Sequence, residues 1–444
     1  MSGAFLPRRL FTLVLLMGFI TACGGDDDDP PGADTLAEPP GEAVPGEFSR
    51  ELTPEVEDTT FEEFSSHNRD FAFDLFAHIG ADQGDDENVF ISSHSITSAL
   101  AMAYAGAQNE TRDEMAEVLR YQVDDATLFP SFNKLDLALH SRAEISGDDD
   151  PPTLAIANQT WGHRDLDFVQ DYLNILSQHF GSDMRAVDFA NDYEETRQAI
   201  NEWVEDRTED RIKDLLPPDS LSAATRFVLV NAIYFYADWK NPFDDDRTQE
   251  QPFHLLDGTT VDVPLMRKTE NISYATDDDT VMVSVPYVGD DLGFVAWMPA
   301  NDEADFHGWQ HGLDRQGFDS LIDELTPQEV RLFLPRFEQE QGFTLSPIFE
   351  EMGMTRPFEA IGDFVGIAEA PAGTDLFISE IFHKTFIKVD EEGTEAAAAT
   401  AVVGDGATAA PPEPVVVRLD RPFYYAIYDH PTDSILFLGR MTNP

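Results

Sequence analysis

The sequence is poor in cysteine and in basic residues, and both shortages limit what the chain can be. Its 444 residues include one cysteine, so no disulfide can form within the chain and the fold must rest on its core. Lys and Arg number 28 against 85 Asp and Glu, for a net charge of −57. Such a surface repels polyanions, so we expect no binding to nucleic acid or to anionic membrane surfaces. Charge of this size is typical of salt-adapted proteins, where screening weakens self-repulsion, so we expect a salt requirement for folding.

The motifs of the common enzyme classes are also missing. There is no Gly-x-Ser-x-Gly elbow, no His-Glu-x-x-His helix and no glycine-rich phosphate loop after a strand. The 11 histidines are scattered without the Cys–His spacing of metal sites, and the acidic runs lack the spacing of a calcium loop. We therefore expect no enzyme, no metal and no cofactor. A catalytic triad assembled from distant residues is the alternative that the sequence leaves open.

The amino-terminal segment predicts export. Arg8 and Arg9 precede an apolar run over 10–20 that is too short to cross a membrane and is typical of a signal peptide. The residues before Cys23, Ile20-Thr21-Ala22, resemble the lipobox of bacterial lipoproteins, in which the cysteine is lipidated after cleavage. We expect 1–22 to be removed and Cys23 to anchor the protein to a membrane, facing the periplasm or the cell surface. An incidental cysteine beside an ordinary cleavage site is the alternative.

Residues 23–60 are expected to form a disordered acidic tether, because Gly, Pro, Asp and Glu dominate and little surface could be buried. Residues 61–444 contain no second linker and read as one α+β domain, since helical and strand patterns are mixed without βαβ alternation. Helices are expected over 61–79, 95–107 and 193–211, with a further helix capped by Thr111 and Glu114. Strands are expected over 225–236, 331–337 and 377–389, followed by a terminal hairpin.

One run of charged and very small residues stands between two strand patterns. It reads Glu391, Glu392, Gly393, Thr394, Glu395, Ala396, Ala397, Ala398, Ala399 and Thr400. The connection from Asp390 to Val415 that contains it is far longer than compact domains normally use, and such loops are usually functional or disordered. Helix propensity alone would make the alanine tract a short exposed helix.

This run is similar, almost residue for residue, to the proximal hinge of the reactive-centre loop of inhibitory serpins. Further resemblances to that family cover nearly all of 61–444 in the same order, and they lie at 88–96, 231–243, 334–337, 353–358, 421–423 and 437–440. Ser93 is a departure, because the family usually has proline there. The resemblance implies the serpin fold, with three β-sheets, about eight or nine helices and an exposed loop at about 391–414.

The resemblance also implies a suicide-type inhibitor of serine proteases. The protease cuts the loop and forms an acyl-enzyme, and the loop then inserts as a new strand of the main sheet, trapping a covalent complex with a monomeric inhibitor. Alternate residues of an inserted strand enter the core, and this set is Thr394, Ala396, Ala398 and Thr400, all small and uncharged. Glu395 belongs to the other set. This pattern favours inhibition over the alternative, a non-inhibitory serpin acting as a binding or chaperone module.

The spacing in the family places the reactive bond at Ala407–Thr408, to within one or two residues. The neighbourhood 402–409 contains no Arg, Lys or aromatic residue, so it favours an elastase-like or subtilisin-like protease that accepts small residues. A flexible loop without a selected target is the alternative.

Six other residues match conformational positions of the family. Four of them correspond to a polar cluster beneath the sheet, where strands part to admit the loop: Ser92, Ser95, Asn231 and His383. Arg336 matches the partner of Glu391 in a hinge salt bridge. Trp239 matches an aromatic residue at the end of the sheet where insertion begins.

Overall fold

The structure, a computed structural model, describes residues 38–142, 152–301, 304–369, 376–394 and 413–444. It confirms the α+β class. The described residues contain nine α-helices: α1 Asp58–Gln83, α2 Ser93–Tyr104, α3 Asn109–Val118, α4 Asp125–Ser141, α5 Gln170–Ile175, α6 Phe189–Arg207, α7 Phe306–Gln310, α8 Arg315–Glu324 and α9 Ser346–Glu351.

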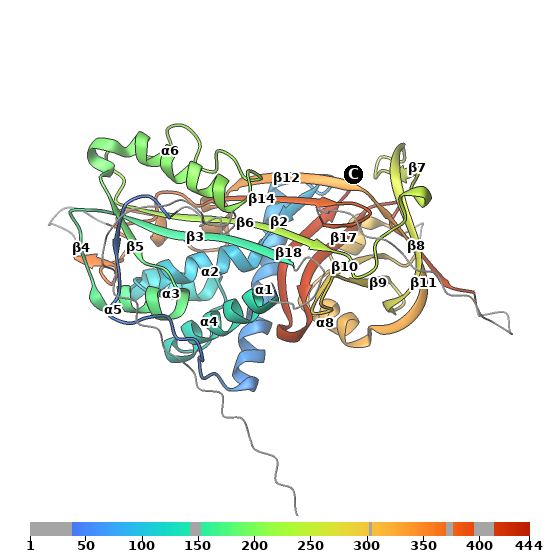
Figure 1. Cartoon of the computed structure of the whole chain (residues 1–444), viewed down its shortest axis with the longest axis horizontal. Helices are drawn as coiled ribbons and strands as arrows, with labels where there is room; N and C mark the ends of the chain where they lie inside the picture. Colours follow the sequence, from blue (N-terminus) through green and yellow to red (C-terminus); the bar gives the residue numbers. More distant parts are fainter. Residues whose placement is uncertain (1–37, 143–151, 302–303, 370–375, 395–412) are drawn as a thin grey trace, which may run out of the picture. The chain divides into compact units, whose positions relative to one another are not determined.

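The sheet that matters for function has seven strands in the order β1-β5-β3-β6-β14-β12, with β15 paired to β6 (Figure 1). Most neighbours are antiparallel, whereas β3 with β5 and β6 with β14 are parallel. We call it sheet A. Its strands are β1 Glu42–Val44, β5 Met184–Val187, β3 Thr153–His163, β6 Phe227–Asp238, β14 Phe382–Val389, β12 Phe337–Thr344 and β15 Gly393–Thr394.

A nine-stranded second sheet has the order β16-β11-β8-β9-β10-β17-β18-β2, with β7 paired to β8, and β4 and β13 form a two-stranded third sheet. The bounds are β2 Val89–Ile91, β4 Asp167–Phe168, β7 Gln249–His254, β8 Thr260–Thr276, β9 Thr280–Pro286, β10 Leu292–Pro299, β11 Thr326–Pro335, β13 Ala368–Glu369, β16 Val415–Arg418, β17 Phe423–Asp429 and β18 Ser434–Met441.

Strand β6 is apolar on both faces because sheet A is covered on both sides. Alternate residues such as Val230 and Ala232 pack with Trp203 of α6 in a smaller cluster, while Ile233 and Phe235 belong to the main core. Figure 1 shows α6 over one face of the sheet and α2 with its neighbouring helices against the other. This two-sided burial explains the nearly continuous apolar run at 227–235.

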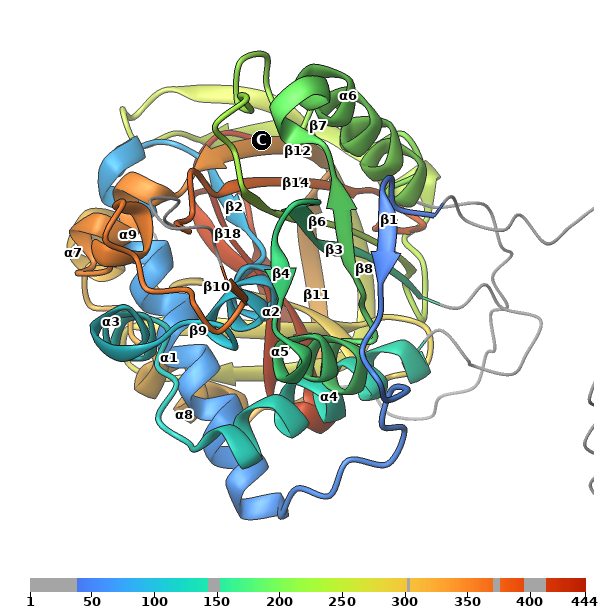
Figure 2. The ribbon, with the colours of Figure 1, turned by 90° about the vertical axis from the view of Figure 1, so that its left-hand side faces the viewer.

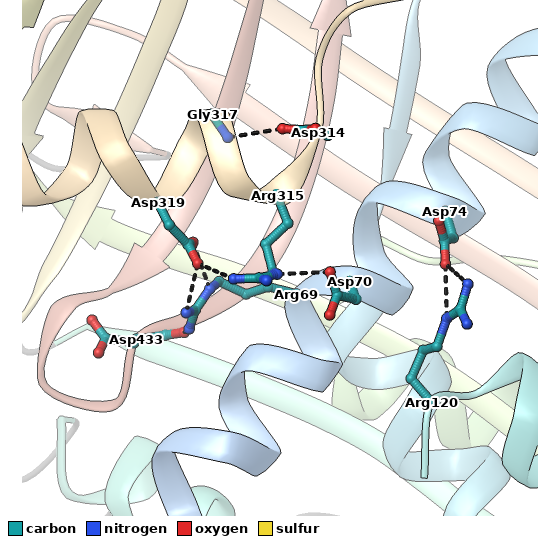
Figure 3. Close-up of polar contacts among 9 residues, drawn as sticks. All are labelled: Arg69, Asp70, Asp74, Arg120, Asp314, Arg315, Gly317, Asp319 and Asp433. Carbon is teal, nitrogen blue, oxygen red and sulfur yellow. Dashed lines mark hydrogen bonds and ion pairs between the residues drawn. The ribbon is translucent and has the colours of Figure 1, made fainter. Parts of the chain in front are cut away.

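A network of ion pairs ties α1 to α8 and to the turn between β17 and β18 (Figure 3). Arg69 binds both carboxylate oxygens of Asp319 at 2.9 and 3.1 Å and donates to the carbonyl of Asp433. Arg315 bridges Asp319 and Asp70 at 2.6 and 2.7 Å. Because the chain has no disulfide among its described parts, such bidentate contacts and the core hold its helices in place.

The folded region begins earlier than the sequence predicts. Residues 38–57, expected within a disordered tether, lie along the domain, and β1 pairs with β5 at the edge of sheet A (Figure 2). The Trp161 indole donates to the Pro40 carbonyl at 2.9 Å, and the backbone of Gly46 donates to Ser177 at 2.9 Å. Arg50 binds Asn133 and Asp136 of α4. We call this segment the N-terminal strap.

Three local expectations also need correction. The residue before α3 is Gln108, and Thr111 lies inside the helix, where its hydroxyl accepts from the backbone of Asp363. The strand expected over 331–337 is interrupted at Arg336, where β11 of the second sheet ends and β12 of sheet A begins. The strand expected from 377 begins at Phe382.

Candidate functional site

The side chain of His383 joins β14 to β6 and to the start of α2. The backbone N–H of Ser92 donates to its Nε2 at 3.1 Å, so the ring proton lies on Nδ1 and is donated to Asn231 Oδ1 at 2.8 Å. Burial lowers the pKa of His383 to about 3, which keeps the ring neutral and able to accept. The Ser92 hydroxyl donates to the Leu436 carbonyl at 2.7 Å, so it is not activated by the histidine.

Asn231 extends this hydrogen-bond network from β6 to the neighbouring strand β3. Its Nδ2 donates to the hydroxyl of Ser95 and, at 2.7 Å, to Oδ1 of Asn158 on β3. The structure therefore brings all four predicted residues together and adds Asn158, which the sequence reasoning missed. An asparagine within an ordinary strand pattern gives no sign of this role. We call Ser92, Ser95, Asn158, Asn231 and His383 the polar cluster.

The polar cluster lies where strands β6 and β14 of sheet A share only a short stretch of backbone pairing. The pairing of β14 with β6 covers only His383–Phe386 opposite Asn231–Tyr234, and it is parallel. Here His383 and Asn231 are direct partners, so their side-chain hydrogen bond crosses the junction. We call these four backbone pairs the seam. Beyond it, towards Asp238, β6 is paired with β15 instead.

Strand β15 is formed by the third and fourth residues of the hinge run, and it is already part of the sheet. Gly393 and Thr394 pair antiparallel with Asp238 and Ala237. Thr394 is fully buried, and its hydroxyl lies 2.7 Å from that of Tyr287. A Cβ on Gly393 would lie 2.3 Å from the Ala237 carbonyl oxygen, so only glycine allows this close approach.

Glu391 and Trp239 hold the hinge at the end of the seam. Glu391 is 5% exposed, and its carboxylate accepts from the Thr248 hydroxyl at 2.6 Å, a partner that the sequence did not indicate. Arg336 lies 3.5 Å from the other oxygen, with 49% of its side chain exposed, so this predicted contact is the weaker of the two. Trp239 donates to the carbonyls of Glu392 and Asp390 and stacks on Tyr287.

Comparison with known proteins identifies the family. The family described as Serpin (serine protease inhibitor) matches residues 66–444. An uncharacterized serpin-like protein of Thermococcus kodakarensis is 37% identical, with 84% of each chain covered, and the leukocyte elastase inhibitor of Sus scrofa is 35% identical over 86% of this chain and all of its own. The chain belongs to the serpin family. The crystal structure of tengpin, a thermophilic serpin in the native state, superposes with a TM-score of 0.75 at 28% identity, covering 89% of this chain and 98% of tengpin.

Several predicted site residues of this serpin lie outside the described residues. They are Glu395, Ala396, Ala397, Ala398, Ala399 and Thr400 of the hinge run, the predicted reactive bond Ala407–Thr408, and Cys23. In the ranges that are described, no helix is both long and apolar enough to cross a membrane, and no group of three or more His, Cys, Asp or Glu is placed to hold a metal ion.

Proposed function

We propose that this serpin inhibits serine proteases by inserting its cut loop into sheet A. The observation that carries the proposal is the hinge geometry: Thr394 pairs with β6, is fully buried, and its hydroxyl lies 2.7 Å from that of Tyr287. Gly393 and Thr394 thus supply the first two residues of a strand antiparallel to β6. An inserted loop would extend a pairing that has already begun.

Continuing this register predicts where the other hinge residues go. Ala396, Ala398 and Thr400 would stand opposite Phe235, Ile233 and Asn231 of β6. Directly opposite residues of an antiparallel pair point to the same face, and on β6 these residues face the main core or the polar cluster. The face that must be buried therefore receives only alanine and threonine.

The same register explains why the polar cluster matters. Residues 397–400 would occupy the positions opposite Tyr234–Asn231, where β14 now pairs with β6. The four seam pairs and the His383–Asn231 hydrogen bond must break before the loop can enter. Each backbone hydrogen bond gained by the new strand contributes on the order of 0.5–1.5 kcal/mol net. A fully inserted strand forms more backbone hydrogen bonds than the four pairs of the seam lose. The difference in free energy drives insertion.

The protease, not the serpin, would carry out the cleavage of the loop. Its serine Oγ attacks the carbonyl carbon of Ala407, the peptide bond to Thr408 breaks, and the Thr408 amine leaves with the proton that the protease base received from the serine. An ester to Ala407 remains. Insertion would then carry the esterified protease away from the released carboxy-terminal segment. The small residues at 402–409 and the similarity to a leukocyte elastase inhibitor support an elastase-like or subtilisin-like target.

The chain itself supplies no catalysis in this proposal. Ser284 and His430 form a Ser–His contact at 3.1 Å among the described residues, but the side chain of Ser284 is buried and out of reach of a substrate. We further propose that the protein acts as a monomer, that Cys23 anchors it to a membrane as an exported lipoprotein, and that its −57 charge makes folding salt-dependent.

Incubation with pancreatic elastase and subtilisin tests the proposal, with trypsin as the comparison protease. We expect a protease–serpin complex that survives boiling in detergent with elastase or subtilisin and little complex with trypsin. Simple cleavage without a complex would support the alternative, a non-inhibitory binding or chaperone module. A rise in thermal stability after loop cleavage would show insertion separately from protease trapping.

A further inference from the structure

Strand β14 reaches β15 through a tight turn over residues 390–393, which we call the hinge turn. The backbone N–H of Asp390 donates to the Gly393 carbonyl at 3.0 Å, and the Asp390 side chain accepts from the backbone N–H groups of Glu392 and Gly393 at 3.1 and 3.3 Å. Because β14 is parallel to β6 and β15 is antiparallel to it, the chain reverses direction at this turn. The hinge turn is therefore already closed in the uncleaved protein, at the point where an inserted strand would start.

The segment 239–243 that follows β6 binds the hinge turn, and we call it the support loop. The backbone N–H and the indole N–H of Trp239 and the backbone N–H of Phe243 donate hydrogen bonds of 2.8, 2.9 and 2.6 Å. In that order, the acceptors are three carbonyls of the hinge turn: Glu392, Asp390 and Glu391. Since one short segment binds three consecutive carbonyls, the position of the hinge turn depends on the conformation of the support loop.

Two charged residues of β8 in the second sheet hold the support loop. The Lys268 ammonium donates to the Asn241 carbonyl at 2.9 Å, and the Glu270 carboxylate accepts from the Asn241 side-chain amide. Lys268 and Glu270 also pair with each other at 3.1 Å. The Nζ of Lys268 lies 4.5 Å from the centre of the Phe243 ring and 5.6 Å from that of Trp239, distances at which a cation is attracted to an aromatic ring. Lys268 therefore contacts the middle and both ends of the support loop.

This ion pair lies inside the protein, where charge is costly. Lys268 is 8% exposed, and burial lowers its pKa while the neighbouring Glu270 opposes that shift. A buried ion pair adds little net stability, because the desolvation of two charges offsets their attraction. Its best-attested role is to fix one arrangement of the chain among several. Here the arrangement that it fixes is the conformation of the support loop.

We propose that Lys268 and Glu270 are positioning residues for loop insertion. They fix the support loop, the support loop holds the hinge turn, and the hinge turn places Gly393 and Thr394 against β6 so that the next residues can follow. A strand of the second sheet thus controls how fast sheet A accepts a new strand. This inference rests on the proposed function, because it concerns the rate of the insertion step.

The first test reads the support loop in the uncleaved, full-length protein and needs no protease. Hydrogen exchange at the amides of Trp239 and Phe243 should be about tenfold faster in Lys268→Met than in wild type, the factor expected when a hydrogen bond from a charged donor is lost. Lys268→Arg keeps a charged donor and should restore slow exchange. Lys240→Met is the matched control, because Lys240 lies in the same loop but pairs with Asp290 at the surface. Wild-type exchange in Lys268→Met would overturn the proposal.

The second test follows insertion with a fluorophore in the loop. Lys268→Met should slow insertion about tenfold while the rate at which a protease cleaves the loop stays at the wild-type value. A merely structural role would not separate these two rates. Asn241→Ala, at an exposed position where folding is not at risk, should slow insertion in the same direction by removing the amide that Glu270 accepts from.

Insertion is measured after cleavage of the loop, whether or not a covalent complex with the protease forms. A protein that inserts its loop without trapping a protease would contradict the inhibitory function and leave this inference standing. Wild-type insertion rates in both Lys268→Met and Asn241→Ala, or equal slowing in Lys240→Met, would overturn the positioning role.

Discussion

Replacing Thr394 by arginine should convert the inhibitor into a substrate. Thr394 is fully buried, and the only described polar side chain within hydrogen-bond distance of its hydroxyl is that of Tyr287, at 2.7 Å. An uncompensated buried charge costs about 3–5 kcal/mol, whereas the few hinge hydrogen bonds contribute about 1 kcal/mol each. The hinge should therefore leave the sheet, and insertion would have to bury the same charge again.

A barrier raised by about 3 kcal/mol slows insertion on the order of a hundredfold. Deacylation would then precede insertion, and the stoichiometry of inhibition should rise steeply while cleavage of the loop continues. Thr394→Val keeps the shape of the side chain and leaves the Tyr287 hydroxyl unpaired, which costs about 1–3 kcal/mol. Because this pair is already formed before insertion, Thr394→Val should slow insertion far less than Thr394→Arg does. Glu395→Arg is the matched control, since an inserted strand that continued the register of Gly393 and Thr394 would point that residue to the other face.

The assay is stopped-flow insertion kinetics with a fluorophore in the loop, together with the ratio of complex to cleaved inhibitor on denaturing gels. Wild-type rates in Thr394→Arg, or an equal loss in Glu395→Arg, would refute the assigned register.

Three further predictions concern the hinge and the seam. Gly393→Ala should expel the hinge, because its Cβ would meet the backbone of β6 at 2.3 Å; limited proteolysis at the hinge should become faster, and an unchanged rate would contradict this. Thr248→Val should promote polymers or inactive forms more than Arg336→Gln does, because Thr248 binds the buried Glu391 at 2.6 Å whereas Arg336 is half-exposed. Arg336→Glu should promote them more than either, because it places a negative charge beside the Glu391 carboxylate. Size-exclusion chromatography after mild heating measures the fraction of polymer formed by each variant. The pKa of His383 is lowered from 6.5 to about 3, so the folded state binds fewer protons than the unfolded state below pH 6.5. Its contribution to stability is present above pH 6.5 and is lost as pH falls towards 3, by up to about 1.4 kcal/mol per pH unit. Thermal melts should show a steeper loss of stability on acidification in wild type than in His383→Asn, which keeps the other buried histidine of lowered pKa, His94.

Much of the fold was predictable because its signals are local. The apolar run of β6 and the terminal hairpin follow from periodicity. The family resemblance predicts that Ser92, Asn231 and His383 form one cluster, and the structure joins them by hydrogen bonds. The small residues of the hinge run predict a strand that enters a packed core, and for Ala396, Ala398 and Thr400, outside the described ranges, this stays a prediction.

The rest depended on contacts between distant segments. The N-terminal strap has the composition of a tether, and it is ordered through single hydrogen bonds to Trp161 and Ser177 that no local pattern reveals. Thr248 and Asn158 are polar residues in ordinary surroundings along the chain, and only the fold brings them to Glu391 and Asn231. The Thr111 capping signal was overridden because that hydroxyl binds Asp363 instead.

Intact mass spectrometry of the detergent-stable complex tests the central claim most directly. After incubation with pancreatic elastase or subtilisin, we predict a species whose mass equals the protease joined by an ester to the inhibitor ending at Ala407, or within two residues of it. The peptide that begins at Thr408, with the same tolerance, should appear as a separate product. A cleaved inhibitor with both fragments free and the protease fully active would contradict the account.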